Sequence, residues 1–126
     1  MNHDEHLDKA SDKRVTTEVL AMKTLLESIV PGTTVEYFRA PGGNSSPHLR
    51  EMAAAWGMKS LGWSVDTKDW QRPSVDEIIN TVNKQLHSGG VILMHDAGGD
   101  RSNTVTALEK VIPQLKKDGY QFVFPG

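Results

Sequence analysis

The stretch Val91-Ile92-Leu93-Met94-His95-Asp96 decides the fold prediction. Its four apolar residues end in a histidine and a carboxylate, and glycine pairs lie on both sides, at Gly89-Gly90 and Gly98-Gly99. A short apolar run between glycines is typical of a strand buried in a parallel sheet. In such sheets, catalytic and ligand-binding groups gather beyond the carboxyl ends of the strands. We therefore expect His95 to act there as a general acid or base, and the alternative is a structural histidine that hydrogen-bonds a loop.

Apolar periodicity and turn residues around this stretch predict four helices that alternate with four strands. The predicted helices cover 12–30, Pro47 to Gly57, Ser74 to Gly89 and 103–117, and the predicted strands cover 35–38, 59–65, 91–94 and 121–124. Pro113 is expected to bend the last helix or to delay its start. The inward faces are predicted to be Val15, Val19, Met22, Leu26 and Ile29; Leu49, Met52, Ala53 and Trp56; Val75, Ile78, Ile79, Val82 and Leu86; and Val105, Leu108, Ile112 and Leu115.

Alternation of helices and strands indicates an α/β fold with mostly parallel strands joined by right-handed crossovers. A closed barrel needs about eight strands, so the four strands predict part of a (β/α) barrel. With 126 residues, one domain over residues 1–126 is the natural expectation.

The composition is ordinary for a soluble protein, with 37% hydrophobic residues, 24% charged residues and a net charge of -2. This balance gives no reason to expect nucleic acid or an anionic membrane as a partner. No apolar run approaches the roughly 20 residues of a membrane span, and the first residues do not resemble a signal peptide. The absence of cysteine excludes disulfides and thiolate zinc sites.

Polar residues follow three of the predicted strands and are expected to share one rim. They are Arg39, the pair Asp66 and Asp69, and His95 with Asp96. Asp69 near His95 would hold the imidazole and stabilise its charged form, as a general acid requires. The alternatives are an Asx-type turn at Asp66 to Asp69 and a surface salt bridge at Arg39.

Two histidines near the start of the chain, His3 and His6, could face one metal ion from a single helical turn. The alternative is a frayed terminus whose histidines bind nothing. Leu93 and Trp70 could wall a small apolar pocket beside His95, although core packing explains them equally well. His48 and His87 are predicted to be surface residues.

Three ordered segments resemble successive signatures of the NodB-type polysaccharide deacetylases, carbohydrate esterase family 4. They are Phe38-Arg39-Ala40-Pro41-Gly42-Gly43, Trp63-Ser64-Val65-Asp66-Thr67-Lys68-Asp69-Trp70 and Ile92-Leu93-Met94-His95-Asp96. Asn2-His3 with Leu7-Asp8 resembles the metal-binding histidine stretch of that family. Similarity continues through Gly99-Asp100-Arg101-Ser102-x-Thr104 and Gly119-Tyr120-x-Phe122-Val123.

The resemblance implies metal-dependent hydrolysis of an acetamide, with a divalent ion, zinc or alternatively cobalt, held by His3 and His6. It implies that His95 protonates the departing amine, that Asp69 tunes His95, and that Arg39 orients the catalytic base. It also implies that the Gly42 backbone N–H helps to hold the oxyanion. Trp70 and Leu93 match the walls of the acetyl-methyl pocket.

The sequence departs from the family pattern in three places. The family's Thr-Phe-Asp-Asp-Gly-like signature, which carries the base and a third metal ligand, does not occur in the chain. His3 and His6 are three residues apart where the family has four, and Gly42 replaces a tyrosine. We therefore expect the first strands of the barrel to be missing, which puts the activity of this chain in doubt.

Three hypotheses follow for the function. The first is a deacetylase acting on N-acetylated or O-acetylated polysaccharide, such as chitin oligomers or peptidoglycan. The second is a non-catalytic carbohydrate-binding remnant, and the third is a chain that completes its barrel with a partner or by self-association. The family usually works outside the cytoplasm, whereas the chain carries no export signal, so the resemblance alone suggests an extracellular or cell-wall location.

Overall fold

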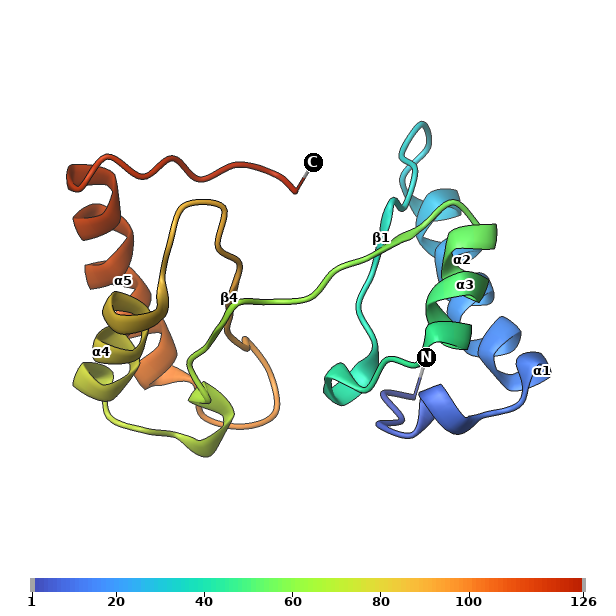
Figure 1. Cartoon of the computed structure of the whole chain (residues 1–126), viewed down its shortest axis with the longest axis horizontal. Helices are drawn as coiled ribbons and strands as arrows, with labels where there is room; N and C mark the ends of the chain where they lie inside the picture. The colour runs from blue at the N-terminus through green and yellow to red at the C-terminus, as the bar shows by residue number, and fades with distance from the viewer. Residues whose placement is uncertain (1, 126) are drawn as a thin grey trace. The chain divides into compact units, whose positions relative to one another are not determined.

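The computed structural model describes residues 2–125 and divides the chain after Gly62 into two compact units, which we describe separately. Both units contain helices (Figure 1) and a pair of short parallel strands. The predicted α/β class with parallel strands is therefore confirmed. Within residues 2–125, no helix is long and apolar enough to cross a membrane.

The first unit begins with an almost continuous helical region. It consists of η1 (Leu7–Lys9), α1 (Asp12–Val15), the π-helical η2 (Thr16–Leu20) and α2 (Ala21–Ile29). Strand β1 (Tyr37–Phe38), the short η3 (Pro41–Gly43), helix α3 (Pro47–Ala55) and strand β2 (Lys59–Ser60) follow. Helix α3 starts at Pro47 as predicted, and Ser46 caps it by accepting a hydrogen bond from the Leu49 N–H.

Strands β1 and β2 run parallel, with Tyr37 opposite Lys59. The core of this unit is formed by apolar side chains from η1, α1, η2, β1 and α3, together with Ala40 after β1 and Met58 after α3. These residues are Leu7, Val15, Val19, Phe38, Ala40, Leu49, Ala53 and Met58.

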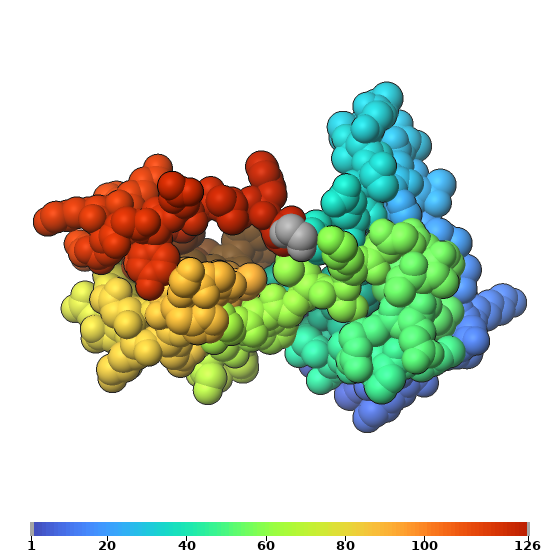
Figure 2. Space-filling model, turned by 45° about the horizontal axis from the view of Figure 1, so that its top comes forward, coloured from blue at the N-terminus to red at the C-terminus, as the bar shows by residue number. Residues whose placement is uncertain are grey.

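The predicted inward face of the first helix is wrong at its carboxyl end. Leu26 is 44% exposed and Ile29 is 64% exposed, whereas Val15 and Val19 are buried as predicted. The turn that follows α2 projects from the rest of this unit (Figure 2). The apolar period extends farther along the helix than the core that this unit provides, so periodicity alone could not show where burial stops.

The second unit contains β3 (Val65–Asp66), η4 (Asp69–Gln71), α4 (Val75–Gln85), β4 (Ile92–Leu93) and α5 (Ser102–Lys117). Strands β3 and β4 are parallel, with Val65 opposite Ile92. Helices α4 and α5 pack against each other (Figure 1). The core consists of Val65, Val82, Val111 and Leu115, with Ile79, Leu86, Ile92, Met94 and Tyr120 packed around it.

The strand predicted over 59–65 is wrong, because two separate strands replace it. Residues 59–60 pair with β1 of the first unit, whereas Val65 and Asp66 pair with β4 of the second. Gly62 lies between them, and a glycine weakens a strand because it has no side chain to pack. The strand predicted over 121–124 is also absent, since within the described part of the chain those residues are not paired with another strand.

The core-facing side of α5 differs from the prediction by about one residue. Leu115 is buried as predicted and Leu108 and Ile112 are half-buried, but Val105 is 54% exposed, and the other buried residues are Thr104, Ala107 and Val111. This set is as regular as the predicted one, but it includes a small and a polar residue that hydrophobicity does not mark. Pro113 lies inside the helix and does not delay its start at Ser102.

A capping box formed by Ser74 and Glu77 fixes the start of α4, at the position where the sequence predicts a helix to begin. The Ser74 hydroxyl oxygen accepts a hydrogen bond from the Glu77 N–H at 3.3 Å, and the Ser74 N–H donates to the Glu77 carboxylate at 2.8 Å. This geometry satisfies two of the N–H groups that a helix start leaves without partners.

Replacing Ser74 with alanine should lower the free energy of unfolding by about 1 kcal/mol, because the cap of α4 is lost. The measurement is urea unfolding followed by circular dichroism. Ser88→Ala, at an exposed position outside the helices, serves as the matched control and should change stability by less than about 0.5 kcal/mol. Equal effects of the two substitutions would contradict this role of the cap.

Candidate functional site

The second unit contains a buried carboxylate, Asp69, whose side chain is fully inaccessible to solvent. Asp69 begins η4, the short helical turn that follows β3. Its carboxylate accepts three hydrogen bonds: from the His95 ring and the His95 backbone N–H, both at 2.7 Å, and from the Thr104 hydroxyl at 3.0 Å. A buried charge is costly unless it is fully hydrogen-bonded in this way.

His95 follows β4, as predicted, and meets Asp69 where the two parallel strands end. The His95 Nδ1 atom lies 2.7 Å from Asp69 Oδ1, and 37% of the His95 side chain is exposed. Since an ionised carboxylate only accepts hydrogen bonds, Nδ1 carries a hydrogen. Asp69 therefore fixes which ring nitrogen is bound, and no protein group within residues 2–125 forms a hydrogen bond with the other nitrogen, Nε2.

The surroundings of Asp69 keep its carboxylate ionised. Burial alone would raise the pKa of Asp69, but the hydrogen bonds from the His95 ring, the His95 N–H and the Thr104 hydroxyl outweigh burial, and the pKa lies below its ordinary value. The pair thus has the features of a general acid or base held by a carboxylate.

Two further residues bind the Asp69 segment, and the sequence interpretation gave them no role. They are Thr104, which is 3% exposed, and Arg101, whose Nη1 donates to the Asp69 backbone oxygen at 3.2 Å. Both belong to the segment that follows His95 and starts α5. The only sequence signal was their place within Gly99-Asp100-Arg101-Ser102-x-Thr104, where resemblance to the family continued.

The backbone on both sides of η4 adopts the left-handed conformation at residues that are not glycine. Lys68 has a φ of 51° and Arg72 a φ of 60°. This conformation is uncommon for residues with a side chain. Lys68 is also held by its N–H, which donates to Asp66 Oδ1 at 3.0 Å, so the Asx-type turn considered for Asp66 is present.

The residues expected to wall an apolar pocket differ in exposure. Trp70 is 54% exposed, whereas Leu93 is 7% exposed and lies in β4. The Leu93 backbone oxygen accepts a hydrogen bond from the buried Thr67 hydroxyl at 2.8 Å, which joins the ends of β3 and β4. Trp70 therefore offers an accessible aromatic surface directly after the buried Asp69, whereas the Leu93 side chain is packed in the interior.

Arg39 and Gly42 lie in the first unit, after β1, and each is exposed. Within the described residues, Arg39 forms no salt bridge, so the alternative considered for it is not observed. Gly42 has a φ of 60°, and a Cβ atom there would lie 3.0 Å from the Glu5 side chain. Its N–H has no backbone acceptor within residues 2–125, as an oxyanion-binding N–H requires.

His3 and His6 are exposed and also belong to the first unit. Over residues 2–125, no three histidine, cysteine, aspartate or glutamate side chains group as metal ligands. Asp4, between the two histidines, instead pairs with Arg14 at 2.7 Å. Because catalytic zinc takes three protein ligands, the described residues provide an incomplete ligand set.

The remaining histidines are on the surface, as predicted. His48 Nε2 lies 2.8 Å from Asp12 Oδ1, and this contact raises the pKa of His48. His87 is exposed beside the Ser88 backbone oxygen.

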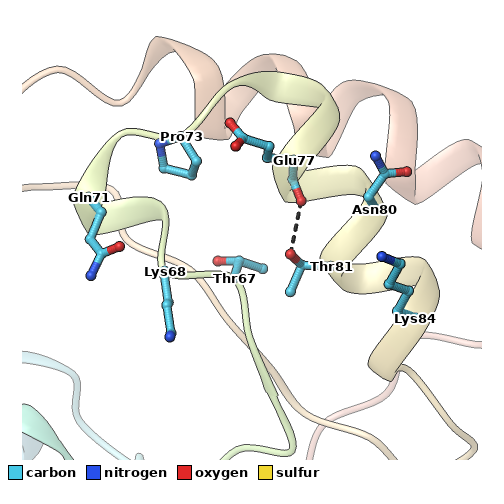
Figure 3. Close-up of a pocket in the computed structure, with 8 residues that line it drawn as sticks. All are labelled: Thr67, Lys68, Gln71, Pro73, Glu77, Asn80, Thr81 and Lys84. Carbon is cyan, nitrogen blue, oxygen red and sulfur yellow. Dashed lines mark hydrogen bonds between the residues drawn. The ribbon is translucent and has the colours of Figure 1, made fainter.

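A shallow hollow of about 370 Å³ lies between the η4 segment and α4 (Figure 3). Most of the residues that line it have polar side chains: Thr67, Lys68, Gln71, Pro73, Glu77, Asn80, Thr81 and Lys84. Asp69 and His95 do not line it. The Thr67 hydroxyl is bound to Leu93, the Glu77 carboxylate to Ser74, and the Thr81 hydroxyl to the Glu77 backbone oxygen, so these three side chains are already hydrogen-bonded.

Replacing Asp69 with asparagine should lower the free energy of unfolding at pH 7 by roughly 2–4 kcal/mol. The substitution removes the buried negative charge and one of the carboxylate oxygens that accept hydrogen bonds from His95 and Thr104. Folding lowers the pKa of Asp69, so its stabilisation is present above the unfolded pKa, about 3.9, and is lost as the pH falls through the folded pKa. Urea unfolding at pH 7 and pH 3 tests this. The difference between wild type and Asp69→Asn should shrink at pH 3, and Asp96→Asn, at the exposed neighbour of His95, is the control. A difference that stays constant with pH would contradict the assignment.

Comparison with known proteins begins with sequence. No protein-family model matches the chain. The chain is similar to a peptidoglycan-N-acetylglucosamine deacetylase of Bacillus cereus, with 39% identity over 98% of the chain and 57% of the relative. It is also similar to a chitooligosaccharide deacetylase of Bradyrhizobium, with 32% identity over 91% of the chain and 58% of the relative. The chain thus spans somewhat more than half the length of these relatives.

Solved structures agree with the sequence comparison. A family 4 carbohydrate esterase from Streptomyces lividans, in complex with acetate, matches 94% of the chain and 58% of its own length, with a TM-score of 0.82 and 30% identity. A CE4 family pseudoenzyme from Bacillus anthracis matches 95% of the chain and 41% of its own length, with a TM-score of 0.85 and 28% identity. These matches confirm the predicted fold class, a partial barrel of the NodB type. The chain is homologous to the NodB-type polysaccharide deacetylases, carbohydrate esterase family 4, over the part of the fold that it spans.

Proposed function

We propose that the chain is a hydrolase domain that removes acetyl groups from N-acetylated polysaccharide, with His95 as its proton donor. The observation that supports this proposal is the His95–Asp69 pair, in which a buried, ionised carboxylate binds the imidazole at 2.7 Å. Relatives named as deacetylases supply the reaction class.

In this proposal, His95 supplies the proton that lets the amine leave. Water attack on an acetamide carbon gives a tetrahedral intermediate, and breaking its C–N bond releases a poor leaving group unless the nitrogen is protonated. Asp69 holds Nδ1 and stabilises the positive charge of the imidazolium, so Nε2 is the nitrogen that delivers the proton. The partial exposure of the His95 ring, 37%, is compatible with access by a polymer.

The other site residues have auxiliary roles in the proposal. Arg39 would orient the catalytic base, and the Gly42 N–H would bind the oxyanion. Trp70 and Leu93 would contact the acetyl methyl group. The accessible indole of Trp70 and the Gly42 N–H without a backbone acceptor support two of these assignments.

Peptidoglycan and chitin oligomers are the proposed substrates, since the relatives named above are deacetylases of these two glycans. Both present N-acetylglucosamine, so the site chemistry that we describe suits either.

Acetate release from N-acetylglucosamine oligomers and from peptidoglycan, with zinc or cobalt added, tests the proposal. His95→Ala should reduce the rate by about 10²- to 10⁴-fold, the usual contribution of a general acid. His87→Ala, at an exposed histidine of the same unit, is the control and should retain the wild-type rate. Acetate release that survives His95→Ala would overturn the proposal.

A non-catalytic carbohydrate-binding protein is the second candidate function. The observation that favours it is the incomplete metal ligand set over residues 2–125, together with similarity to a CE4 family pseudoenzyme. Oligosaccharide binding measured by calorimetry, with no acetate released by the wild-type chain, would favour this candidate over the first.

We also propose that His3 and His6 contribute to a divalent cation site, with zinc as the cation that imidazole suits best. Zinc titration by calorimetry should show binding that His3→Ala or His6→Ala weakens by more than about tenfold. His48→Ala, which removes an exposed imidazole elsewhere in the same unit, is the control. Unchanged affinity in both test variants would exclude these ligands.

A further inference from the structure

Two side chains outside the proposed reaction converge on Asp69 from the segment that follows His95. The buried Thr104 hydroxyl donates to Asp69 Oδ2 at 3.0 Å, and Arg101 Nη1 donates to the Asp69 backbone oxygen at 3.2 Å. Asp69 is thus held at its side chain and at its backbone by residues at the start of α5.

Thr104 limits the orientation of the carboxylate. Oδ2 accepts from both the His95 N–H and the Thr104 hydroxyl, while Oδ1 accepts from the His95 ring. Since the ring hydrogen bond depends on where Oδ1 points, any rotation of the carboxylate tilts the imidazole. Two of the three donors belong to His95 itself. The third is the Thr104 hydroxyl, which therefore holds the carboxylate from outside the pair.

Arg101 links the two loops that carry Asp69 and His95. Besides the Asp69 oxygen, its guanidinium donates to the backbone oxygens of Ala97 at 2.9 Å and Gly98 at 3.1 Å. Ala97 and Gly98 lie two and three residues after His95. The rigid fork of a guanidinium can hold three carbonyl groups in one arrangement, which a lysine ammonium cannot reproduce.

We propose that Thr104 and Arg101 are positioning residues for the Asp69–His95 pair. Thr104 sets the orientation of the Asp69 carboxylate, and Arg101 sets the spacing between the Asp69 loop and the loop after His95. The catalytic consequence rests on the proposed function, whereas the effect on the hydrogen bond between the two residues does not.

The first test measures the Asp69–His95 hydrogen bond by NMR in the full chain without substrate. The readout is the rate at which the His95 Nδ1 hydrogen exchanges with water. Thr104→Val, which keeps the shape but removes the hydroxyl, should raise this rate by about tenfold, because loss of one good hydrogen bond to a charged group is a change of that order. Thr104→Ser should restore the wild-type rate, and Thr106→Val on the same helix is the control.

Arg101→Lys provides an independent variant at a partly exposed residue, should Thr104→Val fail to fold. Lysine keeps the positive charge but lacks the planar guanidinium that binds three backbone oxygens. This variant should therefore also speed exchange of the His95 Nδ1 hydrogen. Arg50→Lys is the matched control, because Arg50 likewise binds a backbone oxygen, that of Ser45, in the first unit. Wild-type exchange rates in folded Thr104→Val or in Arg101→Lys would overturn the proposal for that residue.

The second test is kinetic and separates this inference from the proposed function. In a chain that releases acetate, Thr104→Val should lower kcat about 10- to 100-fold while KM changes less than about threefold, since misplacement by 1 Å can cost that much. A fall in kcat that matches the loss of folded protein, and that Thr104→Ser does not rescue, would indicate a structural role alone. If the wild-type chain releases no acetate, the proposed function fails, and the exchange measurement still decides the positioning role.

Discussion

A charge buried without solvent must be matched by hydrogen bonds, and in this chain that constraint falls on Asp69. Its carboxylate is inaccessible and accepts from two groups of His95 and from Thr104. These bonds outweigh the cost of burial and leave the carboxylate ionised. The ends of β3 and β4, the loop after His95 and the start of α5 are all placed by the need to satisfy this one side chain.

The parallel pairing of β3 with β4 makes this convergence possible. Parallel strands end at the same edge of a sheet, so the segments that follow them are close without any long connection. Asp69 follows β3 by three residues and His95 follows β4 by two. The glycines after His95 complete the arrangement: Gly98 has a φ of 83°, and a Cβ atom there would lie 3.3 Å from the Arg101 side chain. A larger residue would displace the guanidinium that binds both loops.

The sequence predicted the parts of the structure that depend on short-range signals. The helix starts at Ser74 and Pro47 and the strand before His95 were all predicted correctly, because each is specified by neighbouring residues. The pairing of Asp69 with His95 was also anticipated, from strand ends that should share a rim.

Other features depend on partners far along the chain and could not be predicted. Thr104 is a polar residue on the buried side of α5, and hydrophobic periodicity counts it as a surface residue. Burial of Leu26 and Ile29 was expected from their spacing, yet a helix face is buried only where another element covers it. Residues 121–124 are rich in aromatic and branched side chains, but a strand also requires a neighbour for its backbone groups.

The left-handed residues Lys68 and Arg72 have a consequence for how this region would evolve. Each left-handed non-glycine residue costs about 1–2 kcal/mol relative to the right-handed conformation. Contacts with the rest of the unit must therefore stabilise the backbone at Lys68 and Arg72, because these residues alone would not favour it. Glycine at either position would remove this cost without changing the backbone conformation on the two sides of Asp69. The chain therefore keeps a side chain at two positions where the backbone alone would favour none.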